Sequence, residues 1–397
     1  MTDTALLAVL IAVVGGTLAG RAWAASRSRG PRKGREAFHS SSHYTQGLHY
    51  LATGHLDPAT HEFAKVLREH PDAVEVQQVL SHLHREVGHV EKAIELHKTL
   101  LARSDLTRAE RVHTLASLGT DYRKAGFLDR AAQAYAEALE VDPGNLHALE
   151  GEQKLFEDQR EWRQAYEAQT RIARLRKSDD GLVLAYLQTE MGHEAARAGL
   201  WDEAEAAFRT ALSLDQRATP AYLALAELWA ERDTNRAASI LESAIAAVPE
   251  RAYLAFDPLE RAYAKSGELS RFVALCERLI EQDPRDWRAR LALARHLRAE
   301  GRPGEALGLL LRALESNPHV LLVHLQVWRT LRALGQLGPE EQRFATTVEE
   351  SALYVDPHIC TACRYRADDM LWRCPHCHEW NTFVEERVGL VTPGTRL

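Results

Sequence analysis

The chain has 397 residues, of which 45% are hydrophobic and 26% charged, the balance of a folded body rather than of a disordered chain. Helix-forming Ala, Leu, Arg and Glu abound while aromatic residues reach only 7%, so composition favours an all-α fold. A net charge of −7 gives no basic footprint of the kind that nucleic-acid binding requires. Of five cysteines, four stand in C-x-x-C pairs, which argues against a secreted disulfide framework and indicates a reducing compartment.

Residues 1–23 are predicted to form a transmembrane anchor. Residues 4–20 carry no charge and, as a helix, span roughly 25 Å, slightly less than a ~30 Å hydrocarbon core. Arg21 can snorkel and Trp23 can lie at the interface, which covers the difference. A cleaved signal peptide is the competing interpretation, because "AWAAS" offers small residues for cleavage. A signal peptide carries positive charge before its apolar stretch, however, and here the only early charge is acidic, so we expect the anchor to stay uncleaved.

A basic flank follows the anchor in residues 24–39, which we interpret as a juxtamembrane linker. The basic residues after the apolar segment, with no acid among them, are Arg21, Arg27, Arg29, Arg32, Lys33 and Arg35. The positive-inside rule therefore places the N-terminus outside and the bulk of the chain in the cytoplasm. Attraction to anionic headgroups is expected as a by-product of this stop-transfer flank.

Residues 40–350 repeat with a period near 34. Each copy has a turn residue followed by core residues at +5, +9 and +12, and often by a proline at +17, and the steps between copies run from 33 to 39 residues. The clearest copies begin at Gly54, Gly126, Gly199 and Gly301; weaker copies begin at Gly88, Arg160, Arg232 and Gly267; and a partial ninth follows Gly335. This pattern is typical of the tetratricopeptide repeat.

The repeat predicts how each helix pair packs. Gly47 and Gly119 fall where the first helix needs a small residue to let the second approach, and Tyr50 and Tyr122 follow three positions later. Each pair leaves an apolar face that the next pair covers, so the array should grow as a superhelical solenoid with a concave groove. The expected fold class is thus an all-α tetratricopeptide-repeat solenoid with an N-terminal transmembrane helix and a small C-terminal metal module.

No enzymatic apparatus is visible in the repeats. "HEFAK" at 61 and "HEAAR" at 193 begin like a zinc-protease motif but lack its second histidine, and no phosphate-binding loop, dinucleotide fingerprint or nucleophile elbow occurs. Cys276 occupies a core slot and is expected to be a buried structural thiol. His82, His84 and His97 are expected on helix surfaces or between helices rather than as ligands. We therefore predict that the chain is not an enzyme.

Residues 355–390 carry the one strong chemical signal. Cys360-x-x-Cys363, ten residues and Cys374-x-x-Cys377 have the spacing of two knuckles that present four thiolates to one Zn²⁺ or Fe ion. A module this small has too little apolar core to fold alone, so metal binding should supply most of its stability. His376 and His378 are nearby, but four cysteines already complete the coordination shell. Further residues of the module expected to pack around the cluster or against the last repeat are Trp372, Trp380 and Phe383.

Anchor, basic flank, repeats and terminal motif together resemble the lipopolysaccharide assembly protein B family. The terminal motif reads C-x-x-C…W-x-C-P-x-C-x-x-W-x-T and consists of Cys360, Cys363, Trp372, Cys374, Pro375, Cys377, Trp380 and Thr382. The resemblance implies a cytoplasm-facing, single-pass protein of the bacterial inner membrane with a periplasmic N-terminus and a rubredoxin-like module, in which the four cysteines hold iron. The residues alone leave iron and zinc open.

The resemblance also implies a function. Members restrain lipopolysaccharide synthesis by promoting degradation of the lipid A pathway deacetylase by a membrane-bound AAA+ protease. Both of these proteins are then expected partners, together with other lipopolysaccharide synthesis or transport proteins gathered at the membrane. One position departs from the family: Arg364 stands where glycine commonly follows the second cysteine, and glycine tolerates a positive φ there.

We accordingly expect a membrane-tethered adaptor, with two alternatives. One is a metal- or redox-sensing scaffold, and the other is a rubredoxin-like electron-transfer component, against which stands the lack of any flavin or nicotinamide site. Nucleic-acid binding by the cysteine module is disfavoured because residues 357–390 mix basic and acidic side chains without a basic stripe.

Overall fold

The computed structural model describes residues 37–351 and 358–385. The predicted anchor, residues 24–36 of the basic flank, and the ends of the predicted metal module lie outside the described residues. Within the described ranges, none of the helices has both the length and the apolar character needed to cross a membrane.

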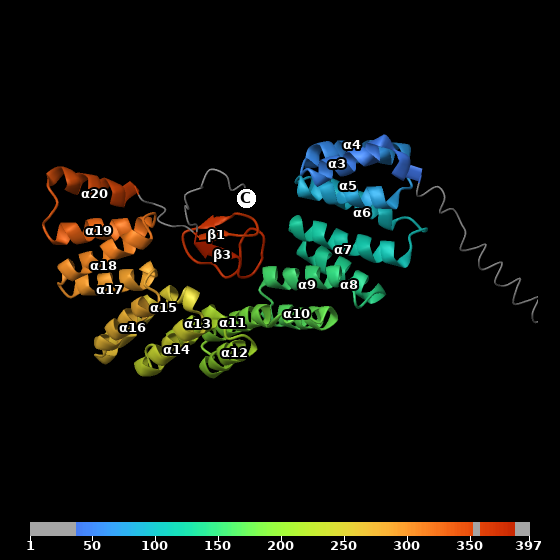
Figure 1. Cartoon of the computed structure of the whole chain (residues 1–397). Coiled ribbons are helices and arrows are strands. Elements are labelled where there is room, and N and C mark those ends of the chain that lie inside the picture. The colour runs from blue at the N-terminus through green and yellow to red at the C-terminus, as the bar shows by residue number, and fades with distance from the viewer. Residues whose placement is uncertain (1–36, 352–357, 386–397) are drawn as a thin grey trace, which may run out of the picture. The chain divides into compact units, whose positions relative to one another are not determined.

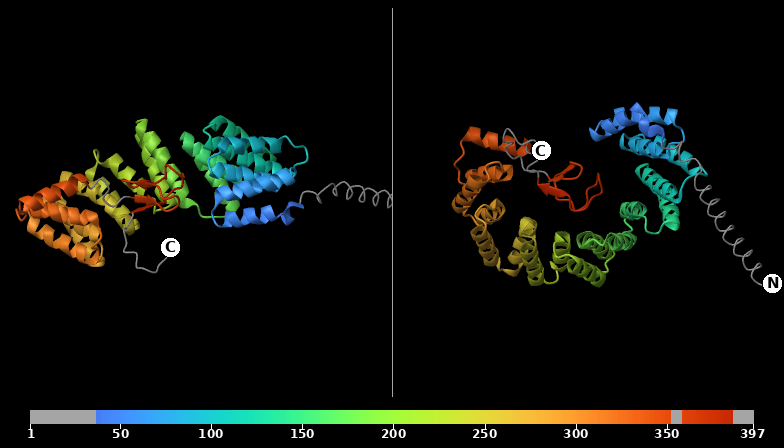
Figure 2. Two further views of the ribbon diagram at one scale, coloured as in Figure 1. Left: turned by 90° about the horizontal axis from the view of Figure 1, so that it is seen from above. Right: turned by 45° about the vertical axis from the view of Figure 1, so that its right-hand side comes forward.

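The chain forms two compact units, Met1–Gln159 and Arg160–Leu397. In each, helices follow one another in chain order (Figures 1 and 2). The first unit contains η1 (Ala37–Ser40), α3 (Ser42–Ala52), α4 (Leu56–Glu69), α5 (Val74–Glu86), α6 (Val90–Leu101), α7 (Arg108–Lys124), α8 (Leu128–Val141) and α9 (Leu146–Gln159). The second contains α10 (Trp162–Arg176), α11 (Gly181–Arg197), α12 (Trp201–Leu214), α13 (Thr219–Trp229), α14 (Thr234–Ala247), η2 (Pro249–Arg251), α15 (Tyr253–Ser266), α16 (Leu269–Gln282), α17 (Trp287–Ala299), α18 (Pro303–Ser316), α19 (Leu321–Ala333) and α20 (Pro339–Ser351), followed by strands β1 (His358–Cys360), β2 (Arg366–Ala367) and β3 (Phe383–Glu385). The expectation of an α-helical repeat solenoid with a small C-terminal module is confirmed.

The turn between the two helices of a repeat is left-handed at eight of the nine predicted turn positions. The residues with positive φ at these turns are Gly54, Gly88, Gly126, Arg160, Gly199, Gly267, Gly301 and Gly335. Arg232 is the exception, because its turn is closed differently: the Asp233 side chain accepts from the Arg236 N–H and caps α14. The glycine pattern in the sequence therefore reports a real backbone requirement, since glycine reaches positive φ without steric cost.

Small residues let the paired helices approach, as the repeat pattern predicts. A Cβ added to Gly119 on α7 would lie 2.6 Å from the ring of Tyr135 on α8, and Tyr135 is fully buried. Gly192 on α11 and Phe208 on α12 repeat the arrangement at 2.4 Å, and Gly47 and Phe63 do so at 3.1 Å. An aromatic ring of the second helix thus lies directly on the backbone of the first.

A buried ionic network ties together three helices of the first unit. Asp121 on α7 has no exposed surface and accepts from Arg85 Nη1 of α5 at 2.9 Å. His97 Nδ1 of α6 lies 2.6 Å from the other carboxylate oxygen. A buried carboxylate needs such partners, because removing one leaves an uncompensated charge. The expectation that His97 serves between helices is confirmed.

Cys276 of α16 is the buried structural thiol that its repeat position predicts. It has no exposed surface. Burial raises its pKa to about 12, and the nearby carboxylates of Glu260 and Glu277 add to the rise. A thiol that stays protonated at neutral pH is a poor nucleophile.

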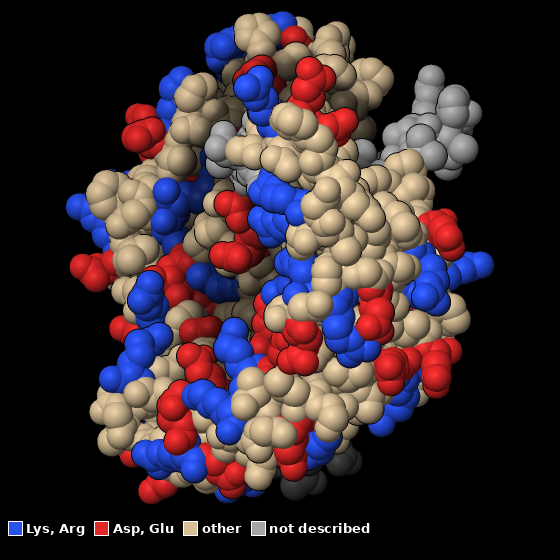
Figure 3. All heavy atoms as spheres, turned by 90° about the vertical axis from the view of Figure 1, so that its left-hand side faces the viewer, with Lys and Arg blue, Asp and Glu red and all other residues tan. Residues whose placement is uncertain are grey.

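Charges of both signs are interspersed on the protein surface. On the face shown in Figure 3, Lys and Arg side chains lie among Asp and Glu side chains. Ion pairs connect successive repeats, such as Lys265 with Glu231 at 2.6 Å and Arg236 with Glu205 at 2.8 Å. These pairs are exposed or half-exposed, and each is expected to contribute about 1 kcal/mol or less.

The tight helix seam predicts a sharp contrast between two glycine substitutions. Gly119→Ala should destabilise the protein by about 1–3 kcal/mol, because the added methyl group overlaps the Tyr135 ring. Gly304→Ala is the matched control: Gly304 lies in α18 with nothing within 4 Å of the added Cβ, so alanine should stabilise by up to about 1 kcal/mol. Urea unfolding followed by circular dichroism measures both, and equal effects would show that the seam tolerates a methyl group.

Candidate metal centre

The C-terminal module is a three-stranded antiparallel sheet with two knuckle loops. The strand order is β2-β1-β3, with Ile359 opposite Arg366 on one side and Cys360 opposite Phe383 on the other. Phe383 is 1% exposed and packs with Cys360 and Cys374 in the module's only apolar cluster among the described residues. So small a core cannot hold the module together by apolar burial alone.

The two knuckles are built alike. In the first, the N–H of Arg364 donates to the Cys360 carbonyl at 2.9 Å; in the second, the N–H of His378 donates to the Cys374 carbonyl at 3.0 Å. The residue after each second cysteine is left-handed, with φ of 65° at Arg364 and 62° at His378. The departure from the family motif at Arg364 therefore has a structural meaning: this chain places a bulky side chain where the backbone favours glycine.

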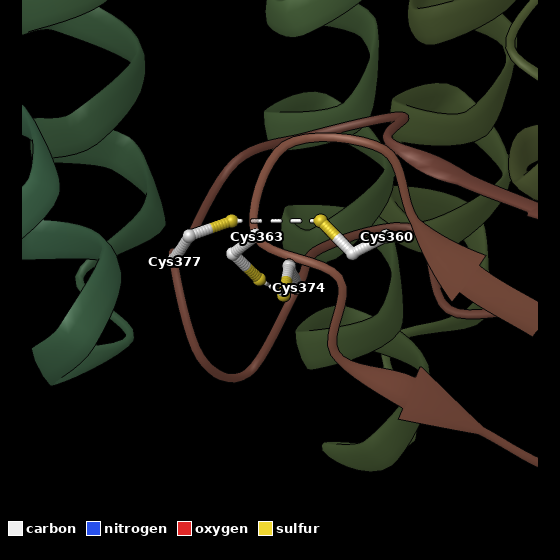
Figure 4. A group of neighbouring side chains, drawn as sticks. All are labelled: Cys360, Cys363, Cys374 and Cys377. Carbon is white, nitrogen blue, oxygen red and sulfur yellow. Dashed lines mark hydrogen bonds between the residues drawn. The ribbon is translucent and has the colours of Figure 1, made fainter. Parts of the chain in front are cut away.

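All four cysteine sulfurs converge on one point. Their Sγ atoms all lie within 4.8 Å of one another, with Cys360–Cys377 and Cys363–Cys374 each at 3.6 Å (Figure 4). A disulfide holds its sulfurs about 2.05 Å apart. Four thiolates at about 2.3 Å from one tetrahedrally coordinated ion lie about 3.8 Å apart. The structure therefore brings together all four predicted residues in an arrangement that fits one cysteine-coordinated metal ion.

The electrostatics of the cluster also fit a cation. Burial opposes ionisation of Cys360, but hydrogen bonds from Thr382 and from the backbone N–H groups of residues 362 and 363 lower the pKa of its thiol to about 6. Burial and the neighbouring sulfurs raise the pKa of Cys377 to about 12. Four thiolates at this spacing therefore need a positive ion among them, and a bound metal supplies it.

The two tryptophans of the module dock it onto the solenoid. The Trp380 ring stacks on Tyr186 of α11, with centroids 5.6 Å apart and planes at 12°, and meets Trp162 of α10 edge-on at 6.5 Å. Trp372 lies 6.2 Å from the same Tyr186 ring. The sequence predicts packing of these tryptophans around the cluster or against the last repeat. The prediction of the last repeat is wrong, because their ring partners lie on α10 and α11, in the middle of the chain. Phe383 packs around the cluster, as the other half of that prediction has it.

Two arginines of the solenoid complete the contact. Arg251, at the end of η2, donates to the Asn381 side-chain oxygen at 2.5 Å, and its guanidinium lies 5.2 Å from the Trp372 ring centroid. Arg288 of α17 forms a bidentate pair with Glu385 of β3, with Nε–Oε1 at 3.3 Å and both side chains less than a fifth exposed. The planar guanidinium suits both bidentate pairing and stacking.

The sequence did not indicate these solenoid partners. Tyr186, Arg251 and Arg288 lie on surfaces that the repeat pattern leaves free to vary, so spacing carries no information about them. Asn381 carries a weak signal. Its φ is 57°, and asparagine is one of the few residue types that tolerate a left-handed backbone conformation. Thr382, whose Oγ1 lies 3.2 Å from Cys360 Sγ, is part of the terminal motif, but the motif spacing does not indicate this contact.

Fold and site together define a tetratricopeptide-repeat protein that carries a rubredoxin-like metal-binding module. Family models agree: one described as "Rubredoxin metal binding domain" matches residues 358–385, and one described as "Tetratricopeptide repeat" matches residues 266–334.

The resemblance to the lipopolysaccharide assembly protein B family is confirmed by curated proteins of that name. The chain is 23% identical over 359 residues to lipopolysaccharide assembly protein B of Escherichia coli K12, covering 90% of this chain and 92% of that protein. The protein of the same name from Haemophilus influenzae is also 23% identical, with coverage of 86% and 89%. Among solved structures, the C-terminal part of a repeat-containing protein from Cytophaga hutchinsonii covers 63% of this chain and 99% of its own, at 17% identity and a TM-score of 0.44, too distant to add to the argument.

Relaxing the first knuckle should stabilise the module. Arg364→Gly is expected to raise the stability of the metal-loaded module by about 1 kcal/mol, because glycine adopts φ of 65° without strain. Ala362→Gly, in the same knuckle but without a positive φ, is the control and should destabilise it by about 0.5–1 kcal/mol. Resistance of the bound metal to removal by a chelator measures both changes. If Arg364→Gly loses its metal more readily than the wild type, the backbone at Arg364 is not strained.

Removing the docking ring should free the module without emptying it. Trp380→Ala removes the stack on Tyr186 and the edge contact with Trp162, and because Trp380 is only partly buried this should cost about 1–3 kcal/mol at this contact. Hydrogen–deuterium exchange should then rise in residues 372–382 and in α11, while the metal content stays at one per chain. Val384→Ala, an exposed residue of the same module, should change neither. Unchanged exchange in Trp380→Ala would mean that the arginine contacts alone hold the module.

Proposed function

We propose that this chain is a membrane-tethered adaptor without catalytic activity of its own, acting in lipopolysaccharide assembly. It restrains synthesis by promoting proteolysis of the lipid A pathway deacetylase by a membrane-bound AAA+ protease, and it gathers other synthesis or transport proteins at the inner membrane. The observation that carries this proposal is the similarity to lipopolysaccharide assembly protein B, which extends over 90% of the chain and stands beside the separate match of residues 358–385 to the rubredoxin metal-binding family model.

The adaptor works through proximity. Repeat solenoids offer long surfaces suited to binding other polypeptides. Tethering such a surface beside a membrane protease raises the local concentration of a bound client to the millimolar range, far above its concentration in the cytoplasm. The predicted anchor in residues 1–23, with its N-terminus outside, supplies the tether and leaves the repeats on the cytoplasmic side.

The metal organises the adaptor. A solenoid repeat contacts only its neighbours, so the array bends easily along its length. The docked module instead contacts Trp162, Tyr186, Arg251 and Arg288, which belong to several different repeats of the second unit. Clamping them together fixes the relative positions of these repeats. On this basis a structural ion, either iron or zinc, is sufficient for function.

Depletion of the protein in cells tests the proposal. The deacetylase should become more abundant and its half-life should lengthen several-fold, and inactivating the membrane protease should abolish the difference. Re-expression of the full chain should restore rapid turnover, whereas a chain lacking residues 1–25 should fold, bind metal and fail to restore it. An unchanged deacetylase half-life on depletion would refute the degradation role.

Metal replacement separates the organising role from electron transfer. Cells that contain only the zinc-loaded protein should degrade the deacetylase at the normal rate, because zinc holds the same four thiolates but does not cycle electrons. Full loss of turnover with zinc bound would favour the electron-transfer or redox-sensing alternative.

A further inference from the structure

A cavity of about 520 Å³ lies between α13 and α15 in the second unit. Its lining consists of Leu223, Ala226, Glu227, Ala230 and Glu231 from α13 and the turn after it, Ala237 and Leu241 from α14, and Leu254, Pro258, Arg261, Ala262 and Lys265 from α15. Most of the lining is apolar and short-chained, which leaves the space between the two helices unfilled. The volume falls within the range of about 300–1,000 Å³ that is usual for ligand sites.

The two walls of this cavity carry opposite charges. Glu227 and Glu231, four residues apart, form the acidic wall, and Arg261 and Lys265, also four residues apart, form the basic wall. Arg261 and Lys265 lie on one face of α15, about one turn apart, whereas Glu227 belongs to the last turn of α13 and Glu231 to the turn that follows this helix. All four side chains belong to exposed residues.

One ion pair joins the two walls and is easily exchanged. Lys265 Nζ and Glu231 Oε1 lie 2.6 Å apart, but their side chains are 50% and 85% exposed. Such a pair contributes little to stability, so a ligand offering its own charges can replace it. One turn away, Glu227 and Arg261 face solvent on opposite walls.

We propose that this cavity is the anchor site for an amphipathic helix of a partner polypeptide. The helix places two or three apolar side chains against the lining residues Leu223, Leu254 and Pro258, basic residues toward Glu227 and Glu231, and acidic residues toward Arg261 and Lys265. A helix lying in an apolar groove, with charges at its edges, is a common mode of recognition. A lipid headgroup or nucleic acid fits poorly, because the acidic wall repels the phosphates that the basic wall attracts. This inference rests on the proposed adaptor function and specifies the chemistry of its client.

Three labelled 15-residue helical peptides test the site on the full-length, metal-loaded protein. All share one Leu face at i, i+3, i+4 and i+7; the first has Lys on one edge and Glu on the other, the second has Glu on both edges, and the third has Lys on both. Fluorescence anisotropy should show that wild type binds the mixed peptide at least tenfold more tightly than either single-charge peptide. Equal affinities, or no binding of the mixed peptide, would overturn the proposal.

Variants of the acidic wall should switch this preference. Glu227→Lys with Glu231→Lys makes both walls basic, so the all-Glu peptide should become the tightest ligand by at least tenfold. The matched control is Glu277→Lys with Glu281→Lys, the same i, i+4 exchange on α16 away from the cavity, which should leave the order unchanged. Ala230→Trp, which fills the cavity, should weaken the mixed peptide at least tenfold, with circular dichroism confirming the fold. An order unaffected by the wall exchange would overturn the proposal.

Further measurements distinguish other occupants of the cavity from failure of the proposed degradation role. Tenfold tighter peptide binding after removal of residues 386–397 would show that the chain's own tail fills the cavity, and weaker binding at rising protein concentration would show that a second copy does; either result overturns the proposal. Selective peptide binding with an unchanged deacetylase half-life would refute the degradation role and leave the site in place.

Discussion

The loop between Trp372 and Thr382 couples metal binding to the docking of the C-terminal module onto the solenoid. It carries Cys374 and Cys377, whose sulfurs meet those of the first knuckle at 3.6 Å, and it also carries the docking residues Trp372, Trp380 and Asn381. A module with so small an apolar core relies on its metal ion for its fold. The rings that stack on Tyr186 therefore hold their positions only while the four thiolates hold theirs.

Docking changes the mechanics of the second unit. Its repeats otherwise depend on nearest-neighbour seams, in which a ring such as Phe208 lies on the backbone of Gly192. The module adds contacts between residues far apart in sequence: Arg288 and Glu385 are separated by 97 positions, and Arg251 and Asn381 by 130. Long-range contacts of this kind give a solenoid a preferred curvature, which a binding surface needs if it is to recognise one client rather than many.

Much of this architecture was predictable from the chain. The solenoid was predicted by the period near 34, the turn glycines and the small residues of the first helices. These positions are constrained by local backbone geometry and packing, as shown by the positive φ at Gly126 and the close approach of Tyr135 to Gly119. The cysteine spacing predicted the cluster for the same reason, since each C-x-x-C knuckle closes within a few residues. Where a local rule was met by other means, as at the turn capped by Asp233, the pattern weakened.

The position of the module on the solenoid was not predictable. It depends on which repeat surface offers Trp162, Tyr186, Arg251 and Arg288 together, and these residues are brought near one another only when the repeats stack. The oppositely charged walls of the α13–α15 cavity arise in the same way, from helices adjacent in space but 34 residues apart along the chain, as Glu227 and Arg261 are. The sequence by itself determined the repeat and the knuckles, because each depends on short-range geometry, and it carried the resemblance to lipopolysaccharide assembly protein B. Only the tertiary structure decided the docking site and the cavity, because both depend on side chains that the repeat leaves free.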